Sequence, residues 1–599
     1  MDSTKRTVSP SFETSSPSRR KLVKSDETGA STATDNSETT KATASTRATT
    51  MEPDESKVNE MDVVIDEDYY QGLRGKPRLL ARGSRAKQIR PEEVDSYGNL
   101  SPALKKAFHI GGHAIAGKLD SGLRQSIIEL LLSMKLGSKW ISVDFVRLGY
   151  AAQRKGNPVV VLVAVEAEKV TPLEAKRIVD DLEVACNRVE LYDVDIEVMD
   201  GNRMISSGIL DPHEPLPDQD DIPLVGSSIA LFREHDHISS GRGTLGGYIE
   251  VDGEIFGLTN QHVCLGPFRV EAYPSGEESK LNSRLYVSQP AEQDLEDAIL
   301  DLTKMLAASR EQKASHHRIA YEQSRLDEMK VWAAKDKNIG YVYQTSGLRV
   351  LEGNVGERFK MDWAIIKLDN TKRFPDPSQI INRVPPYSLR HTDRTSYLGH
   401  AYELGGKELK AETMPSHLKR ALSSKEARHK RNIVEANDKS YIVWKFGRST
   451  HHTCGVVNDV TSIYNSKEGL VSDEWLIIDK TQNGDDAFSK SGDSGSFVWD
   501  SDGFVVGLLW GGKEQVFGTY VTPIETLFED IKNVCGAREV KIVVRPDEDT
   551  VDNNKLFEAG DQSGGRTFAG EASTSATGIP DLFGDGNDFG GFAKVDMEE

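Results

Sequence analysis

Alternation of apolar and polar residues predicts a small α+β unit in the first third of the chain. Leu123 to Gly137 is an apolar-rich run typical of a helix, and residues 140–149 alternate as in a half-buried strand. The wholly apolar run from Val159 to Val165 predicts a central strand, because such strands are buried on both faces. Together these elements place a small α+β module over residues 121–212.

A further helix of this module is predicted by its capping signal. Residues 171–174, Thr-Pro-Leu-Glu, form a capping box with proline at the first helical position. The residues expected on its buried face follow at helical spacing: Leu173, Ile178, Val179 and Leu182. Apolar residues then alternate at Val194, Ile196 and Val198, which predicts a strand. We assign no chemistry to this module from its sequence.

Short, glycine-bounded strands replace this pattern from Pro223 onward. They predict a mainly β domain, a sandwich or barrel, over residues 223–540. Residues 248–259, YIEVDGEIFGLT, are typical of a hairpin with an Asp-Gly turn. Two helical insertions interrupt the domain, at about 291–337 and 411–431. The first is a candidate docking site for a partner, although packing against its own domain is the simpler interpretation.

The two ends of the chain differ in composition from the predicted folded regions. Residues 1–68 are rich in Ser and Thr and poor in aromatic residues, so they cannot bury enough apolar surface to fold. We expect a disordered head there, followed by a linker over residues 69–120. Residues 541–599 are acidic and glycine-rich, and we expect a disordered tail.

Charge, hydropathy and cysteine content argue against several classes of function. The net charge of −20 argues against general nucleic-acid binding. The longest apolar run is too short to cross a membrane, and the polar start lacks the apolar segment of a secretory signal. The four cysteines lie far apart without metal-binding spacing, which predicts buried thiols. We therefore expect a soluble protein of the cytoplasm or nucleus, with no metal and no cofactor.

The segment SKSGDSGSF, residues 489–497, presents a serine inside a glycine-bounded turn. The glycines around Asp493 and Ser494 permit a backbone that exposes the hydroxyl and aims neighbouring N–H groups at one point. The same residue types build ordinary turns, so the tetrapeptide GDSG alone does not distinguish a catalytic serine from a turn between two strands. A nucleophilic serine needs a base and a carboxylate that orients the base. The candidates are His262, in GLTNQHV, and Asp362, at the start of the apolar run in MDWAIIKL.

These segments, in the order His262, Asp362, Ser494, resemble the motifs of chymotrypsin/trypsin-like serine peptidases. GLTNQHV is similar to the histidine motif LTAAHC, MDWAIIKL to DIALLKL, and SGDSGSFV to GDSGGPL. LLWGG and GTYVTPIETLF are similar to later strand segments of the same fold. The resemblance covers about residues 223–540 and implies a double β-barrel with the site between the barrels.

The resemblance also implies a role for each residue. His262 is expected to be the general base, Asp362 its orienting carboxylate and Ser494 the nucleophile. The backbone N–H groups of Gly492 and Ser494 are expected to form the oxyanion hole.

The same resemblance places Phe488, Trp510 and Gly511 in the specificity pocket. An acidic residue at the position of Phe488 would attract Lys or Arg substrates. Phe488 instead indicates a shallow or apolar pocket, which disfavours trypsin-like specificity.

Departures from the secreted enzymes are informative. Val263 and Lys490 stand where those enzymes have disulfide cysteines, in agreement with an intracellular protein. Secreted members are activated by a cut that frees an amine to pair with the aspartate before the nucleophile, here Asp493. No basic residue precedes the segment 222–226, IPLVG, so the partner of Asp493 is not evident from the sequence.

Two functions from different classes follow. The first is an intracellular serine endopeptidase that acts on a protein or peptide substrate through an acyl-enzyme, with its N-terminal region as a candidate inhibitor. The second is a catalytically silent scaffold, in which the peptidase fold, the helical insertion at 291–337 and the two tails bind other proteins.

Overall fold

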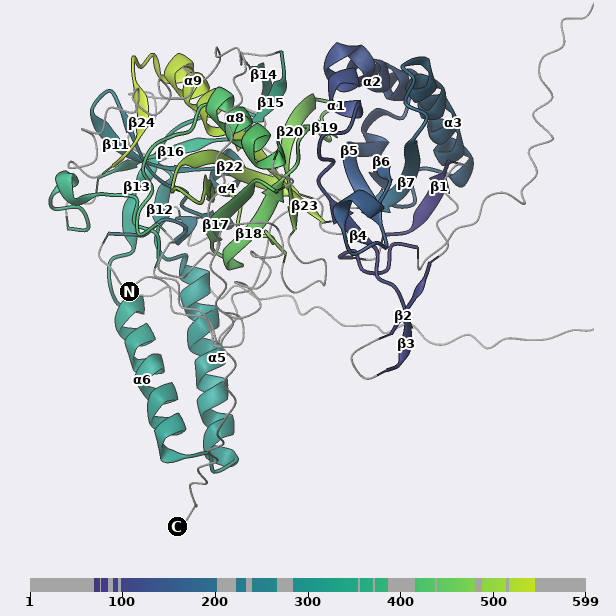
Figure 1. Cartoon of the computed structure of the whole chain (residues 1–599). Coiled ribbons are helices and arrows are strands. Elements are labelled where there is room, and N and C mark those ends of the chain that lie inside the picture. The colour runs from purple at the N-terminus through teal and green to yellow at the C-terminus, as the bar shows by residue number, and fades with distance from the viewer. Residues whose placement is uncertain are drawn as a thin grey trace, which may run out of the picture. The chain divides into compact units, whose positions relative to one another are not determined.

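The structure is a computed structural model of the 599-residue chain (Figure 1). All described residues belong to one unit, Met61–Glu599. The predicted disordered head (1–68) lies outside the described residues, and so does the predicted tail beyond residue 544. The described ranges are 69–75, 77–83, 90–94, 98–201, 222–232, 240–266, 284–353, 356–369, 372–385, 415–436, 439–479, 487–512 and 517–544.

The predicted α+β module is a mixed sheet with helices on one face. Its strands follow the order β1 (Leu79–Arg82), β7 (Val194–Gly201), β6 (Val159–Glu166) and β5 (Trp140–Gly149), and β4 (Lys106–Phe108) also pairs with β5. Strands β6 and β7 are parallel, because α3 (Pro172–Arg188) crosses between them. The other helices are α1 (Ile115–Lys118) and α2 (Arg124–Ser133), joined by a π-turn at Leu119–Leu123.

Most predictions for this module are confirmed. The capping box of Thr171 and Glu174 is formed, and Ile178, Val179 and Leu182 are buried. Leu173 was wrongly placed on the buried face, since it is 48% exposed. The sheet also contains β1 and β4, which come from the span 69–120 that the sequence indicated as a linker.

Strand β5 was predicted to be half-buried, and it is buried along nearly its whole length. One face packs in a cluster with α2 and α3. The other face joins a second cluster that contains Trp510, Phe517 and Tyr520 of the β domain. Strand β19 (Ser462–Asn465) pairs with both β5 and β20 of the β domain, so the two sheets are continuous. The sequence pattern indicated only that one face of β5 is apolar. Contact with the β domain buries the other face as well.

The second half of the β domain is a closed six-stranded barrel. Each strand pairs with the next, and β21 pairs with β17 to close the ring. In order around the barrel, the strands are β17 (Ile442–Gly447), β18 (His451–Val457), β20 (Val471–Asp479), β23 (Gly518–Pro523), β22 (Val505–Gly512) and β21 (Phe497–Asp500).

The first half is an eight-stranded sheet. Among the described strand pairings, its end strands β24 and β9 do not meet, so only the second barrel of the expected pair is closed. The predicted hairpin is formed, with Asp252 and Gly253 both at positive φ, 48° and 88°. In sheet order the strands are β24 (Val540–Ile542), β10 (Gly247–Val251), β11 (Glu254–Thr259), β16 (Ala364–Leu368), β13 (Asn338–Thr345), β12 (Tyr286–Ser288), β8 (Ser228–Phe232) and β9 (Ser240–Thr244).

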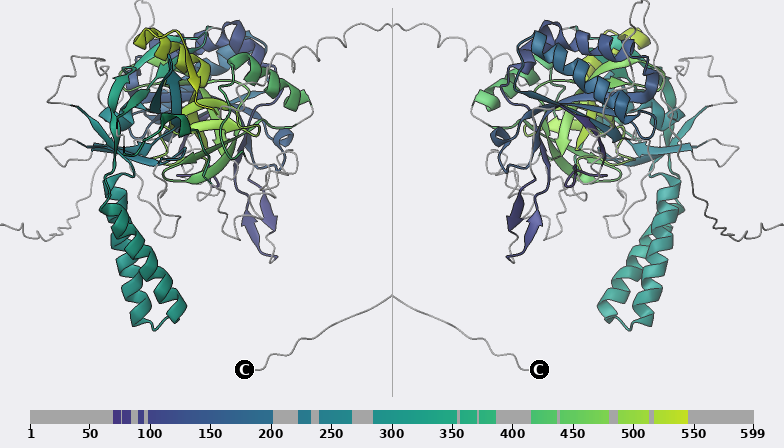
Figure 2. Two further views of the ribbon diagram at one scale, coloured as in Figure 1. Left: turned by 90° about the vertical axis from the view of Figure 1, so that its left-hand side faces the viewer. Right: turned by 90° about the vertical axis from the view of Figure 1, so that its right-hand side faces the viewer.

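The first insertion is a pair of antiparallel helices, as predicted. Helices α5 (Glu292–Glu311) and α6 (His316–Ala333) lie side by side in both views of Figure 2, where they are teal. They share a small apolar core made of Leu295, Leu302, Leu306, Leu326, Met329 and Trp332. The second insertion is helical only from Ser424, where α8 (Ser424–Ala436) begins.

The remaining elements are short, apart from α9 (Ile524–Cys535). They are β2 (Glu92–Val94), β3 (Leu100–Pro102), α4 (Gln261–Leu265), β14 (Arg349–Glu352), β15 (Arg358–Met361), and 3₁₀ turns at Gly137–Lys139, Arg154–Gly156 and Pro377–Gln379. All four cysteines are free thiols. Three of them, Cys186, Cys264 and Cys454, are buried as predicted, whereas Cys535 is only half-buried. Within the described ranges, no helix is both long and apolar enough to span a bilayer.

Candidate active site

His262 lies on α4, the short helix that follows strand β11. Its backbone N–H donates to Asp362 Oδ1 over 3.0 Å, and its Nδ1 lies 2.8 Å from Asp362 Oδ2. An ionised carboxylate only accepts, so Nδ1 carries the proton and Nε2 is left as a free base. The structure therefore brings the predicted base and its orienting carboxylate into contact.

Asp362 lies between β15 and β16 and is 3% exposed. The ammonium group of Lys360 donates to Asp362 Oδ2 over 3.0 Å and also lies 3.9 Å from the centroid of the Trp510 ring. Burial acts to raise the pKa of Asp362, but His262 and Lys360 outweigh it and hold the pKa well below its usual range. Asp362 is thus kept ionised. The sequence analysis missed Lys360, although it lies only two residues before the aspartate.

Ser494 sits in the glycine-bounded turn before β21. A Cβ on Gly495 would lie 2.2 Å from the Thr244 carbonyl oxygen, so only glycine fits this position. The Ser494 carbonyl accepts from the N–H of Thr244, whose own carbonyl accepts from the Thr259 hydroxyl, three residues before His262. The Ser494 hydroxyl donates to the Trp510 carbonyl over 3.3 Å. The turn is therefore linked through Thr244 to the strand that precedes His262, while the Ser494 hydroxyl is bonded to Trp510. Among the hydrogen bonds of the described residues, none joins Ser494 to His262 directly, so the complete triad stays a prediction.

Asp493 has an internal partner that the sequence analysis did not find. Lys445, on β17, places its ammonium group 3.5 Å from Asp493 Oδ2, and neither side chain is exposed. The backbone N–H groups of Ser449, Thr450 and Lys490 also donate to this carboxylate. Burial acts to raise the pKa of Asp493, but Lys445 and these donors lower it below its usual range. Lys445 thus supplies the buried positive charge next to Asp493 that was not evident from the sequence.

The expected oxyanion hole, formed by Gly492 and Ser494, stays a prediction, and the structure shows the contacts around it. Gly492 has φ of 103°, and a Cβ there would approach Ser449 Oγ to 2.2 Å and Arg448 Nη1 to 2.4 Å. The Gly492 carbonyl accepts from Thr244 Oγ1 over 2.8 Å, which fixes the orientation of the peptide that joins Gly492 to Asp493. In the part of the chain that the structure describes, no acceptor binds the N–H groups of Gly492 and Ser494. Both donors are available to a ligand.

The three residues expected in the specificity pocket lie in ordered strands and core. The Phe488 side chain is fully buried in the main core cluster, and its N–H donates to Asp479 Oδ1. The Trp510 ring stacks on Tyr520, with 5.7 Å between centroids. Gly511 pairs with Tyr520 in the barrel. The pocket assignment stays a prediction.

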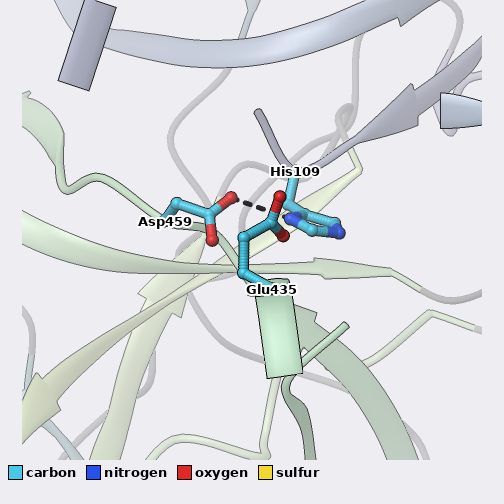
Figure 3. A group of neighbouring side chains, drawn as sticks. All are labelled: His109, Glu435 and Asp459. Carbon is cyan, nitrogen blue, oxygen red and sulfur yellow. Dashed lines mark hydrogen bonds and ion pairs between the residues drawn. The ribbon is translucent and has the colours of Figure 1, made fainter. Parts of the chain in front are cut away.

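A separate cluster of His109, Glu435 and Asp459 brings three metal-ligating atoms within 4.8 Å of one another (Figure 3). His109 Nδ1 is 2.8 Å from Asp459 Oδ2. The guanidinium of Arg154 donates to Glu435 over 2.8 Å and lies 2.9 Å from His109 Nε2. The positive charge that a metal ion would place beside these carboxylates is already supplied by Arg154, so we assign no metal to this cluster.

Comparisons with known proteins agree with the motifs. Residues 406–539 match the model of peptidase family S64. This match contains Ser494 and supports a serine peptidase. No curated protein sequence matches the chain significantly.

Three solved structures of proteases match part of the chain at low similarity. A glutamic-acid-specific serine protease is 12% identical, with a TM-score of 0.24 over 52% of this chain and 97% of that one. Protease A of Thermobifida fusca is 12% identical, with a TM-score of 0.24 over 52% and 96%. Cellulomonas bogoriensis chymotrypsin is 14% identical, with a TM-score of 0.17 over 34% and 88%.

Glu474 is a buried carboxyl group behind the candidate peptidase site. It accepts from the N–H of Lys360, the hydroxyl of Ser472 and the indole N–H of Trp510. Burial raises its pKa to about 8, despite these donors and the charge of Lys360. In the unfolded chain the same group titrates near 4.5.

This difference predicts a loss of stability with rising pH. Between about pH 4.5 and 8 the folded state holds a proton that the unfolded state has released, so stability is greatest below this window and falls as pH rises through it. The limiting slope is about 1.4 kcal/mol per pH unit. Glu474→Gln cannot titrate, and its melting temperature should fall less than that of the wild type between pH 5 and 8. Parallel melting curves for the two proteins would contradict this assignment.

Proposed function

We propose that the chain is a serine endopeptidase that hydrolyses peptide bonds through Ser494, His262 and Asp362. The observation that carries the proposal is the hydrogen bond between His262 and the ionised Asp362. The GDSG turn supports it, because the N–H groups of Gly492 and Ser494 have no acceptor among the described residues. The match to peptidase family S64 supports hydrolysis of protein or peptide substrates.

The reaction would proceed through an acyl-enzyme. Ser494 Oγ attacks the substrate carbonyl carbon while His262 Nε2 takes the hydroxyl proton. The N–H groups of Gly492 and Ser494 would stabilise the oxyanion of the tetrahedral intermediate. His262 then returns the proton to the leaving amine as the C–N bond breaks, and water hydrolyses the ester in the same way. Before the attack, the Ser494 hydroxyl has to turn from the Trp510 carbonyl to His262.

The simplest test is hydrolysis of a peptide library by the purified full chain, with new termini identified by mass spectrometry. We expect cleavage by the wild type and none by Ser494→Ala. Equal cleavage by both proteins would refute the proposal. A wild type without cleavage, paired with a stoichiometric partner in pull-downs, would favour the alternative of a silent scaffold.

We further propose that the N-terminal region restrains this activity. Arg74 Nη1 donates to the Ser489 carbonyl over 2.9 Å, and Nη2 lies 3.8 Å from Asp479 Oδ2. Ser489 belongs to the segment that leads to the nucleophile, and Asp479 accepts from the N–H of Phe488 in the same segment. A contact there can hold the segment in one position.

Arg74→Ala is therefore expected to raise peptide hydrolysis several-fold, measured as initial rate with a fluorogenic peptide. Arg78→Ala is the matched control, because Arg78 pairs with Asp200 inside the α+β module. Its rate should stay near that of the wild type. Restraint by this contact is wrong if Arg74→Ala hydrolyses no faster than Arg78→Ala.

A further inference from the structure

A buried ion pair joins the helical insertion to the second barrel. Asp294, in the first turn of α5, accepts from Nε of Arg448 over 2.7 Å and from Nη2 over 2.5 Å. Neither side chain is exposed. Arg242 and Ser228 also donate to Asp294, so the carboxylate is held from three directions. Such bidentate pairing fixes the orientation of the guanidinium as well as its position.

Arg448 in turn lies against the expected oxyanion hole. Its backbone N–H donates to Thr244 Oγ1 over 3.0 Å, and the same hydroxyl donates to the Gly492 carbonyl. Its Nη1 donates to Ser449 Oγ over 3.3 Å, and that hydroxyl donates to the Ser491 carbonyl over 2.5 Å. The guanidinium also lies so close to Gly492 that a Cβ there would meet it at 2.4 Å.

This arrangement makes the position of the turn depend on a residue of the insertion. A buried guanidinium is unfavourable without a counter-charge. Asp294 supplies such a counter-charge, through hydrogen bonds to two nitrogens of the guanidinium. If the Asp294 carboxylate is lost, the Arg448 guanidinium loses two charge-assisted hydrogen bonds and is expected to move. The peptides of Ser491 and Gly492, which pack against this guanidinium and Ser449, would then be held less firmly.

We propose that Asp294 is a positioning residue for the oxyanion hole. Through Arg448 it holds the turn that carries the N–H groups of Gly492 and Ser494. The first turn of the helical insertion then helps to position the oxyanion hole, because it supplies this carboxylate. The inference rests on the proposed peptidase function and adds a residue that none of the sequence motifs contains.

The test compares Asp294→Asn with Asp297→Asn in the full chain. Asp297 lies one turn along α5 and pairs with Arg242 but not with Arg448, so it is the matched control. Asp294→Asn should lower kcat for peptide hydrolysis about 10- to 100-fold, since small displacements at such a site have effects of this size. The KM should change by about twofold or less, because ground-state contacts with the substrate stay in place. Asp297→Asn should hydrolyse at the wild-type rate.

A second readout does not need activity. Hydrogen exchange of the peptide that spans residues 487–496 should be faster in Asp294→Asn and unchanged in Asp297→Asn, while exchange of β6 stays the same in both. If Asp294→Asn fails to fold, the double variant Asp294→Leu/Arg448→Met replaces the pair by apolar side chains of similar size, a change that buried ion pairs often tolerate. That variant should also show faster exchange at 487–496.

The outcomes separate the two proposals. A wild type without hydrolysis would overturn the peptidase function, and exchange at 487–496 would still decide the role of Asp294. An active wild type, with unchanged kcat and unchanged exchange in Asp294→Asn, would overturn the positioning role alone.

Discussion

Replacing Ser494 by alanine is expected to lower kcat/KM for peptide hydrolysis by about 10⁴-fold or more. The variant lacks the atom that forms the acyl-enzyme, and only binding and the oxyanion hole remain to assist water. His262→Ala should lower kcat/KM by a similar factor, because a serine without its base is a poor nucleophile at neutral pH. The double variant should be no slower than either single one, since the two residues act as a unit.

The measurement is steady-state hydrolysis of one fluorogenic peptide chosen from the wild-type cleavage sites. His317→Ala is the control for a histidine change, because His317 is exposed on α6 away from the triad. It should match the wild type. Losses of less than about tenfold in Ser494→Ala, or additive losses in the double variant, would mean that hydrolysis uses other residues.

Replacing Lys445 by methionine is expected to have the largest effect on stability. Asp493 would keep its N–H donors but lose its buried counter-charge, and an uncompensated buried charge costs about 3–5 kcal/mol. The same loss should loosen the turn that carries Gly492 and Ser494, so hydrolysis should fall with stability. Thermal unfolding and peptide hydrolysis together measure the two effects.

Two further variants make this expectation specific. Lys304→Met removes an exposed lysine that pairs with Asp301 on α5, and such a surface pair is worth about 1 kcal/mol or less. Lys445→Met/Asp493→Asn removes both buried charges and should recover part of the lost stability. If Lys445→Met unfolds at the wild-type temperature, Lys445 does not carry the role that the secreted enzymes give to a freed amine.

Local patterns were sufficient for the features that depend on neighbouring residues. The Asp252-Gly253 turn, the capping box at Thr171 and the helical insertion all follow from residue types that act within a few positions. The pairing of His262 with Asp362 was also predicted, because each residue lies in a short motif that resembles one of the peptidase family.

Features that depend on distant contacts were missed. Lys445 is the one charged residue of strand β17, and Glu474 lies in β20 beside another acidic residue, Asp473. Nothing local indicates which charge Lys445 or Glu474 would face. Strand β5 was expected to have one exposed face, which the β domain covers. Asp294 lies in a segment that the sequence marks only as a charged helix, while Arg448, its partner, is 154 positions away. Pairings over such distances are set by the fold.

The most direct test of the account is the reaction of the purified full chain with a fluorophosphonate, followed by mass spectrometry. This reagent modifies a serine only when its base and oxyanion hole are in place. We expect one adduct in the wild type, on the peptide that contains Ser494, and none in Ser494→Ala or His262→Ala. An unmodified wild type, or an adduct that persists in Ser494→Ala, would contradict the assignment of Ser494 as the nucleophile.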